Sequence, residues 1–141
     1  MKKRILRLPI CLALAICLLL SCAQAAVAPP IQVQYTGIST FSASLNIDGG
    51  VADCASRITM TNTSNTGILA IHLQQSSDNK NWTTLKSWSV RDSQTPVIAL
   101  EKEYSVAPGY YYRLYCTARV YDPNGTQLGF NTQYSPVRRY P

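Results

Sequence analysis

The sequence predicts an all-β protein, folded as a single antiparallel β-sandwich behind an N-terminal signal peptide. Short runs of alternating or β-branched residues recur along the chain, and turn-forming residues separate them at intervals of about 8–14 residues. Beyond residue 25 the chain is rich in Thr, Ser, Asn, Tyr and Val, which suit pleated, half-buried surfaces. Strands that alternate in this way need a second sheet to bury their apolar sides, so a sandwich is expected.

Residues 1–25 have the three parts of a secretory signal. A basic start (1–7) precedes an apolar run (8–20), and Ala23-Gln24-Ala25 supplies the small residues of a cleavage site. This predicts cleavage between Ala25 and Ala26 and a secreted protein without stable membrane insertion, since a transmembrane helix needs about 20 apolar residues. The segment before Cys22 also resembles a bacterial lipobox, so a lipoprotein anchored through Cys22 is the alternative.

We expect a short linker over residues 26–30 and one domain over residues 31–141. The predicted strands cover residues 31–36, 41–48, 51–61, 68–75, 82–90, 97–106, 110–121 and 126–140, the last range holding one or two strands.

Alternation justifies the earlier strands. Phe41, Ala43, Leu45 and Ile47 alternate with polar residues, and Asp48-Gly49-Gly50 ends that run as a turn. The next two strands place these residues on one face: Ala52, Cys54, Ile58 and Met60, then Leu69, Ile71 and Leu73.

Turn residues delimit the later strands. Residues 77–81 form a hairpin-type turn, and Pro108-Gly109 precedes the strand at 110–121. Asp122-Pro123-Asn124-Gly125 is a strong turn, because proline presets φ and Asn-Gly tolerates positive φ. Pro136 suits a sheet edge or a bulge.

The charge gives no support for a nucleic acid partner. The chain has 13 basic and 7 acidic residues, but Lys2, Lys3, Arg4 and Arg7 belong to the leader, which leaves nine basic residues against seven acidic ones. The basic character is therefore mostly a targeting feature.

The segment from Val106 to Ala118 resembles the E–F corner and F strand of fibronectin type III and immunoglobulin-like domains. In those folds a tyrosine hydroxyl bonds back to the corner backbone, and Tyr112, after Pro108 and Gly109, stands at the matching position. Immunoglobulin domains place that tyrosine two residues before the second cysteine, where this chain has Leu114. The resemblance therefore favours a fibronectin-like or merely similar sandwich over a true immunoglobulin domain.

A second resemblance covers most of the exported chain. The segment from Leu73 to Trp88, with Tyr104-Ser105-Val106 and Gly109 to Arg113, is similar to a family of small secreted proteins from Gram-positive anaerobes. That family carries the label of a domain of unknown function. The likeness implies export and this fold, but no activity.

Cys54 and Cys116 are the only cysteines that remain after the leader. In a chain bound for a non-cytosolic space they predict one disulfide between opposing sheets, which stabilises by about 4 kcal/mol in the chain-entropy model. Two buried free thiols are the alternative. A catalytic or metal-binding thiol is the least favoured, because the chain has one histidine, His72.

No catalytic site is evident, so we expect no enzyme and no cofactor or metal. His72 lies between Ile71 and Leu73 in a strand, where a solvent-facing position is expected. The acidic residues are scattered and most lie in turns. An enzyme is therefore the weakest of three functional hypotheses.

The aromatic residues are the best candidates for binding. Alternation along 110–121 turns one set outward as a candidate binding face, namely Tyr111, Arg113, Tyr115, Arg119 and Tyr121. Such a face could bind a protein or cell-envelope partner, or stack against sugar rings of a cell-surface glycan together with a tryptophan. Alternatively, these side chains simply cover an exposed sheet. Trp82 and Trp88 share one alternation phase, and one of them is expected in the core.

Overall fold

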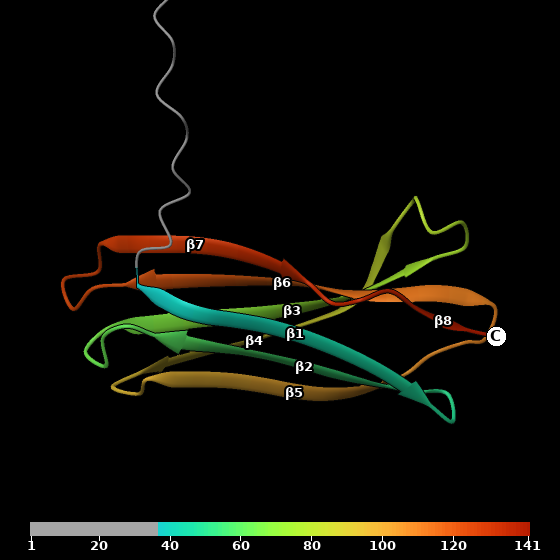
Figure 1. The fold of residues 1–141 in the computed structure, drawn as a ribbon, viewed down its shortest axis with the longest axis horizontal. Coiled ribbons are helices and arrows are strands. Elements are labelled where there is room, and N and C mark those ends of the chain that lie inside the picture. Colours follow the sequence, from blue (N-terminus) through green and yellow to red (C-terminus); the bar gives the residue numbers. More distant parts are fainter. Residues whose placement is uncertain (1–36) are drawn as a thin grey trace, which may run out of the picture. The chain divides into compact units, whose positions relative to one another are not determined.

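The computed structural model describes residues 37–141, which form eight β-strands and no helix (Figure 1). The strands are β1 (Ile38–Asp48), β2 (Val51–Met60), β3 (Thr66–Ser76), β4 (Thr83–Ser93), β5 (Val97–Ser105), β6 (Tyr110–Tyr121), β7 (Gln127–Tyr134) and β8 (Arg138–Tyr140). Several predictions fall outside this range: the leader, cleavage between Ala25 and Ala26, lipidation of Cys22, the linker and a strand at 31–36.

The strands form two antiparallel sheets. One has three strands in the order β1-β2-β5, and the other has five, with the path β4-β3-β6-β7 and with β8 paired to β6 (Figure 1). The predicted all-β sandwich is therefore confirmed. Strand β4 pairs with β3 and therefore belongs to the five-stranded sheet. In immunoglobulin constant-type domains the fourth strand instead lies beside the fifth, in the other sheet. This order agrees with the fibronectin-like pattern.

The strand boundaries differ from the predicted ones by a few residues, and the turns explain where they fall. Gly49 and Gly50 both have positive φ, 54° and 80°, as a two-residue hairpin between β1 and β2 requires. Asp122 accepts hydrogen bonds from the backbone N–H groups of Asn124 and Thr126, which closes the turn before β7. Pro136 lies between β7 and β8, where no ladder hydrogen bond is lost.

The core lies between the sheets and consists of the inward set from each strand. Its largest fully buried side chains include Tyr112, Ile58, Leu69, Ile71, Leu73 and Leu114. Gly67 occupies an inward position on β3, because a Cβ added there would lie 2.5 Å from Cδ1 of Ile98 and 2.9 Å from Sδ of Met60. The absence of a side chain at Gly67 therefore lets the two sheets approach each other at this end of the core.

The corner between β5 and β6 has the geometry of a tyrosine corner. The Tyr112 hydroxyl donates to the carbonyl oxygen of Ala107 at 2.6 Å, and its ring is fully buried. Gly109 has a φ of 90° and its N–H donates to the Tyr140 carbonyl oxygen at 2.8 Å, which ties the corner to the end of β8. Pro108 and Gly109 thus turn the chain so that Tyr112 enters the core.

Strands β4 and β5 are edges of different sheets and lie on the same side of the sandwich. Trp88 and Tyr104 meet there edge to face, with ring centroids 6.1 Å apart, and both pack against the core. Two lysines hold inward positions on these edges, because Lys86 pairs with Leu73 and Lys102 pairs with Cys54. Both lysines remain exposed at the open sides of their strands.

A candidate binding face on the five-stranded sheet

Strand β6 presents the predicted binding residues on the outer side of the five-stranded sheet. Tyr112, Leu114, Cys116, Ala118 and Val120 are buried, and the residues between them point the other way. That outward set includes all five predicted residues: Tyr111, Arg113, Tyr115, Arg119 and Tyr121. Neighbours two residues apart along one strand lie about 6.6–6.8 Å from each other.

The sheet register adds residues from the neighbouring strands. Tyr115 pairs with His72 on β3 and with Tyr134 on β7, so three rings form a row across the sheet. The ring centroids of His72 and Tyr115 are 5.7 Å apart and those of Tyr115 and Tyr134 are 5.0 Å apart. The Ser87 hydroxyl lies 2.7 Å from Nδ1 of His72 and ends the row on β4.

Arg113 is the best-supported side chain on this face. Its guanidinium carbon lies 4.2 Å from the ring centre of Trp82 and 4.6 Å from that of Tyr134. Its Nε donates a hydrogen bond of 2.8 Å to Oε1 of Gln74. These contacts fix the plane of the guanidinium group, while the two terminal nitrogens keep their donors for a ligand.

Two further arginines lie over aromatic rings on the same face. The Arg119 guanidinium is 5.2 Å from the ring centre of Phe130, and that of Arg139 is 5.5 Å from the ring centre of Tyr111. At the far end of β6, the Tyr121 hydroxyl donates to Oε1 of Gln127. We call the set of Trp82, Arg113, Arg119, Tyr111, Tyr115, Tyr134, Phe130, His72 and Arg139 the arginine–aromatic face.

Trp82 reaches this face because of a β-bulge. Trp82 and Trp88 share a phase in the sequence, but the pairing of β3 with β4 slips between Leu73 and Gln74, leaving Leu85 as an extra residue. The slip reverses the side-chain alternation, so Trp88 packs against the core and Trp82 contacts Arg113 on the outside. The shared phase therefore does not persist in the fold.

Charge differs sharply between the two outer faces of the sandwich. Four arginines, Arg91, Arg113, Arg119 and Arg139, hold outward positions on the five-stranded sheet. Within residues 37–141 the only acidic side chain on those strands is Asp92, which pairs with inward-facing Gly67. No carboxylate therefore occupies an outward position on these strands.

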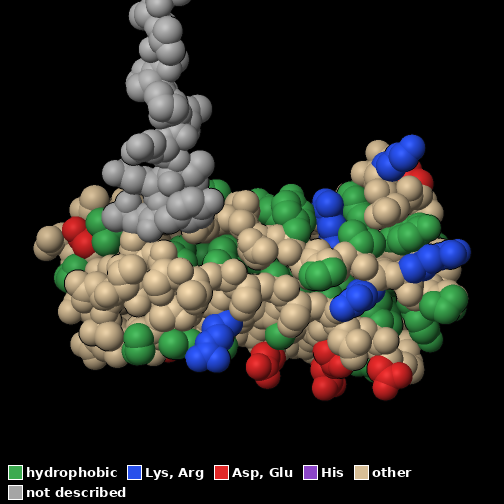
Figure 2. Space-filling model, viewed as in Figure 1, with side chains coloured by type: hydrophobic (Ala, Val, Ile, Leu, Met, Phe, Trp, Pro, Cys, Tyr) green, Lys and Arg blue, Asp and Glu red, His purple; other side chains and the backbone are tan. Residues whose placement is uncertain are grey.

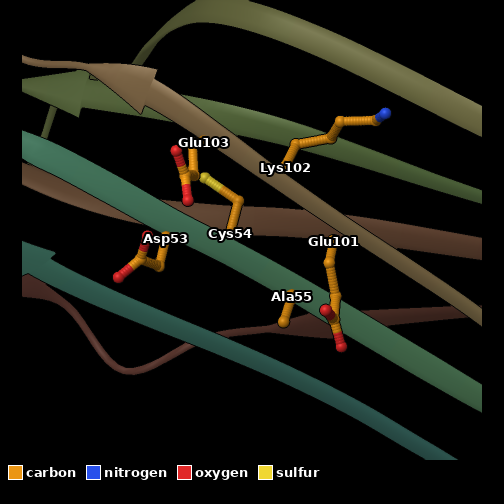
Figure 3. Close-up of a pocket in the computed structure, with 6 residues that line it drawn as sticks. All are labelled: Asp53, Cys54, Ala55, Glu101, Lys102 and Glu103. Carbon is orange, nitrogen blue, oxygen red and sulfur yellow. The ribbon is translucent and has the colours of Figure 1, made fainter.

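The other sheet carries the acidic residues. Asp53 pairs with Glu103 across β2 and β5, and Glu101 follows two positions along the same outer face. Acidic side chains gather along the side of the molecule where β5 lies (Figure 2). Asp53, Cys54, Ala55, Glu101, Lys102 and Glu103 line a shallow open depression there (Figure 3). No cluster of three potential metal ligands is present here or elsewhere in residues 37–141.

Cys54 and Cys116 are free and buried in the structure, so the predicted disulfide is not formed in it. The Cys54 sulfur instead makes a contact of 3.7 Å with the carbonyl oxygen of Ala52. Burial, together with smaller effects of the charges of Asp53 and Cys116, raises the pKa of Cys54 to about 12. Burial also raises the pKa of Cys116, to about 11, although a hydrogen bond with Ser56 acts in the opposite direction and lowers it. Such thiols are poor nucleophiles near neutral pH.

Sequence reasoning missed part of this face. His72 was expected only as a solvent-facing residue, yet its ring stacks on Tyr115. Tyr134, Phe130 and Arg139 lie on strands whose register with β6 cannot be read from a single strand. Their exposure is notable, since 49% of Tyr134 and 42% of Phe130 remain accessible.

No family model matches the chain, and no curated protein matches it. The likeness to small secreted proteins of Gram-positive anaerobes therefore stays a prediction. Residues 37–141 also contain no helix long and apolar enough to cross a membrane.

Proposed function

We propose that this protein is a secreted, non-catalytic interaction module that binds a cell-envelope or protein partner through the arginine–aromatic face. The observation that carries the proposal is the placement of Arg113 between Trp82 and Tyr134 on an otherwise open sheet. Aromatic and arginine side chains are enriched where proteins bind partners, because they combine large contact area with directed hydrogen bonds.

The test is binding of the exported protein to a cell-envelope fraction from its own host. The double variant Tyr115→Ala/Tyr134→Ala should reduce retention at least tenfold, because it removes two rings of the central row. The control Ser44→Ala/Asn46→Ala changes exposed residues of β1 on the opposite outer face and should bind as the wild type does. If both double variants are retained as well as the wild type is, the arginine–aromatic face does not bind the partner.

A small carbohydrate-binding domain is the second candidate. The side chain of Tyr134 is half exposed and that of Trp82 is partly exposed, and both rings contact Arg113. Exposed rings of this kind can stack on the apolar faces of sugars. A glycan array separates the two candidates, since a module that recognises only a protein leaves every glycan unbound.

Export itself is part of the proposal. The leader and the cleavage site between Ala25 and Ala26 predict a mature chain that begins at Ala26, and lipidation at Cys22 is the competing outcome. Mass spectrometry of the protein recovered from its host distinguishes them, because lipidation adds the mass of acyl chains to a chain that begins at Cys22. A mature chain that keeps residues 1–21 contradicts both.

We further propose that Cys54 and Cys116 form a disulfide after export. Both side chains point into the same core from facing sheets, and each is fully buried. The mass of the unreduced protein after alkylation under denaturing conditions decides the matter. A bridged protein takes up no alkyl groups until it is reduced, whereas two free thiols take up two.

A further inference from the structure

We infer that the arginine–aromatic face binds a linear acidic polysaccharide whose carboxylates are held by its arginines. This inference rests on the proposed function of the face and specifies the partner. Arg113, Arg119 and Arg139 each lie over a ring of the face, so three arginine–aromatic pairs follow the line of β6. A linear polymer can follow that line and contact all three pairs.

The anionic character of the ligand follows from the charges of the two sheets. The outward positions of the five-stranded sheet hold four arginines and no carboxylate within residues 37–141. The opposite outer face carries Asp53, Glu101 and Glu103. A polyanion is attracted to the first face and repelled by the second, so charge alone selects the five-stranded sheet.

Carboxylate recognition follows from the way Arg113 is held. Its Nε is already bonded to Gln74, and its plane is held by contacts with Trp82 and Tyr134. The two terminal nitrogens form a fixed fork that matches the two oxygens of a carboxylate. Because the fork is preordered, little side-chain freedom is lost on binding.

The distribution of apolar surface favours a sugar polymer over a protein. A stable protein interface has a continuous apolar centre, but here one row of small and polar outward residues separates Tyr115 and Tyr134 from Phe130. That row consists of Ala70, Thr117, Thr132 and Ser89. Small groups of rings beside hydroxyl groups match the surface of a sugar, which has a small apolar patch surrounded by hydroxyls. The predicted export places the protein where such polymers occur.

The test uses affinity electrophoresis of the exported protein in gels that contain polygalacturonate, alginate or hyaluronate. Retardation is expected with at least one of these carboxylated polymers. For whichever polymer binds, its methyl-esterified form keeps the sugar but neutralises the carboxylates, and the apparent affinity should fall at least tenfold. Equal retardation by the esterified form overturns the role of the carboxylates.

Two arginine variants test the site. Arg113→Lys keeps the charge but loses the planar fork, and Arg113→Gln loses both; each should weaken retardation at least tenfold. The control Arg57→Gln removes a charge from the outer face of the three-stranded sheet and should leave retardation unchanged. Equal losses in Arg113→Gln and Arg57→Gln, with Arg113→Lys unchanged, would mean that net charge alone acts, which also overturns the site.

Other polyanions define the remaining outcomes. Polyglutamate has carboxylates without sugars, and a single-stranded oligonucleotide has bases that stack on aromatic rings. Retardation by either at least equal to that of the best polysaccharide overturns the inference. If the protein binds the cell-envelope fraction through Tyr115 and Tyr134 but none of the three polysaccharides, the inference fails and the proposed function stands. If the protein binds neither the cell-envelope fraction nor any of the three polysaccharides, the inference and the proposed function are both rejected.

Discussion

Tyr112 both fills the core with its ring and anchors the corner between β5 and β6 with its hydroxyl group. Its ring is among the largest fully buried groups of the core, and its hydroxyl reaches past the core to the Ala107 carbonyl. Desolvation raises the pKa of this phenol. The residue therefore fixes the corner between β5 and β6 and, through it, the start of the strand that carries the binding face.

Tyr112→Phe should lower the free energy of unfolding by about 0.5–1.5 kcal/mol, because it removes one hydrogen bond and leaves the packing in place. The loss stays in this range since Ala107 is exposed and water can solvate its carbonyl group. Urea denaturation measures the change. Tyr121→Phe is the matched control on the same strand, as its hydroxyl makes only an exposed bond of 3.3 Å, and it should change stability by less than about 0.5 kcal/mol.

At the scale of elements, the loop between β3 and β4 depends on one carboxylate. Asp78 accepts hydrogen bonds from the Ser76 hydroxyl, from the backbone N–H groups of Lys80 and Asn81, and from the Asn81 side chain. These donors hold the pKa of Asp78 far below its ordinary value. The same loop leads into Trp82, so its order bears on the position of that ring.

The lowered pKa makes the loop sensitive to acid. A carboxylate with a depressed folded pKa stabilises the fold above its unfolded pKa of about 3.9, and this contribution is lost as the pH falls below that value. Urea midpoints of the wild type should therefore fall more steeply between about pH 4 and pH 2 than those of Asp78→Asn. Asp122→Asn serves as a control at another turn. Parallel curves for the wild type and Asp78→Asn would contradict this role.

Most elements could be predicted from local alternation and turn residues. The strand at 110–121 was placed correctly at both ends, and the predicted turn at Gly49-Gly50 fell between β1 and β2. The outward set on β6 followed from the same two-residue period. These features depend on interactions between residues that are close in sequence, which a single chain displays directly.

The rest of the face depends on register, which local sequence does not encode. The extra residue at Leu85 sends Trp82 outward, and no turn residue marks it. The stacking of His72 and Tyr134 on Tyr115 follows from pairing between residues that are 43 and 19 positions apart in the sequence. Such pairs become visible only when the order of strands in the sheet is known.

At the scale of the whole molecule, the spacing between the sheets depends on Gly67. A Cβ at this position would lie 2.5 Å from Cδ1 of Ile98. Gly67→Ala should therefore lower the free energy of unfolding by about 1–3 kcal/mol, the usual cost of overpacking. The affected atoms are ends of flexible side chains, which keeps the cost moderate.

Ile98→Val tests this explanation because it removes the Cδ1 atom that the new Cβ meets. Alone it should cost about 0.5–1.5 kcal/mol, and combined with Gly67→Ala it should cost less than the two changes added together. Thermal or urea denaturation of the four proteins gives the coupling. Strict additivity would show that the contact with Ile98 is not the cause.

The edges of the sandwich are the places where two copies of the molecule can pair through their backbones. Strands β4 and β5 leave unpaired backbone groups on one side of the sandwich, and such edges can pair with another copy. Lys86 and Lys102 occupy inward positions on these strands but remain exposed. A second strand that pairs there has to bury an ammonium group, so each lysine opposes edge-to-edge association.

The double variant Lys86→Val/Lys102→Val should therefore associate more readily than the wild type, although valine suits a strand better than lysine does. Light scattering over a concentration series, at a temperature well below unfolding, measures the association. Lys80→Val with Arg57→Val removes the same charge from a loop and an outer face and is the control. If both double variants associate equally, lost net charge is the cause; if only the edge variant does, the inward position of the two lysines is what keeps the strands apart.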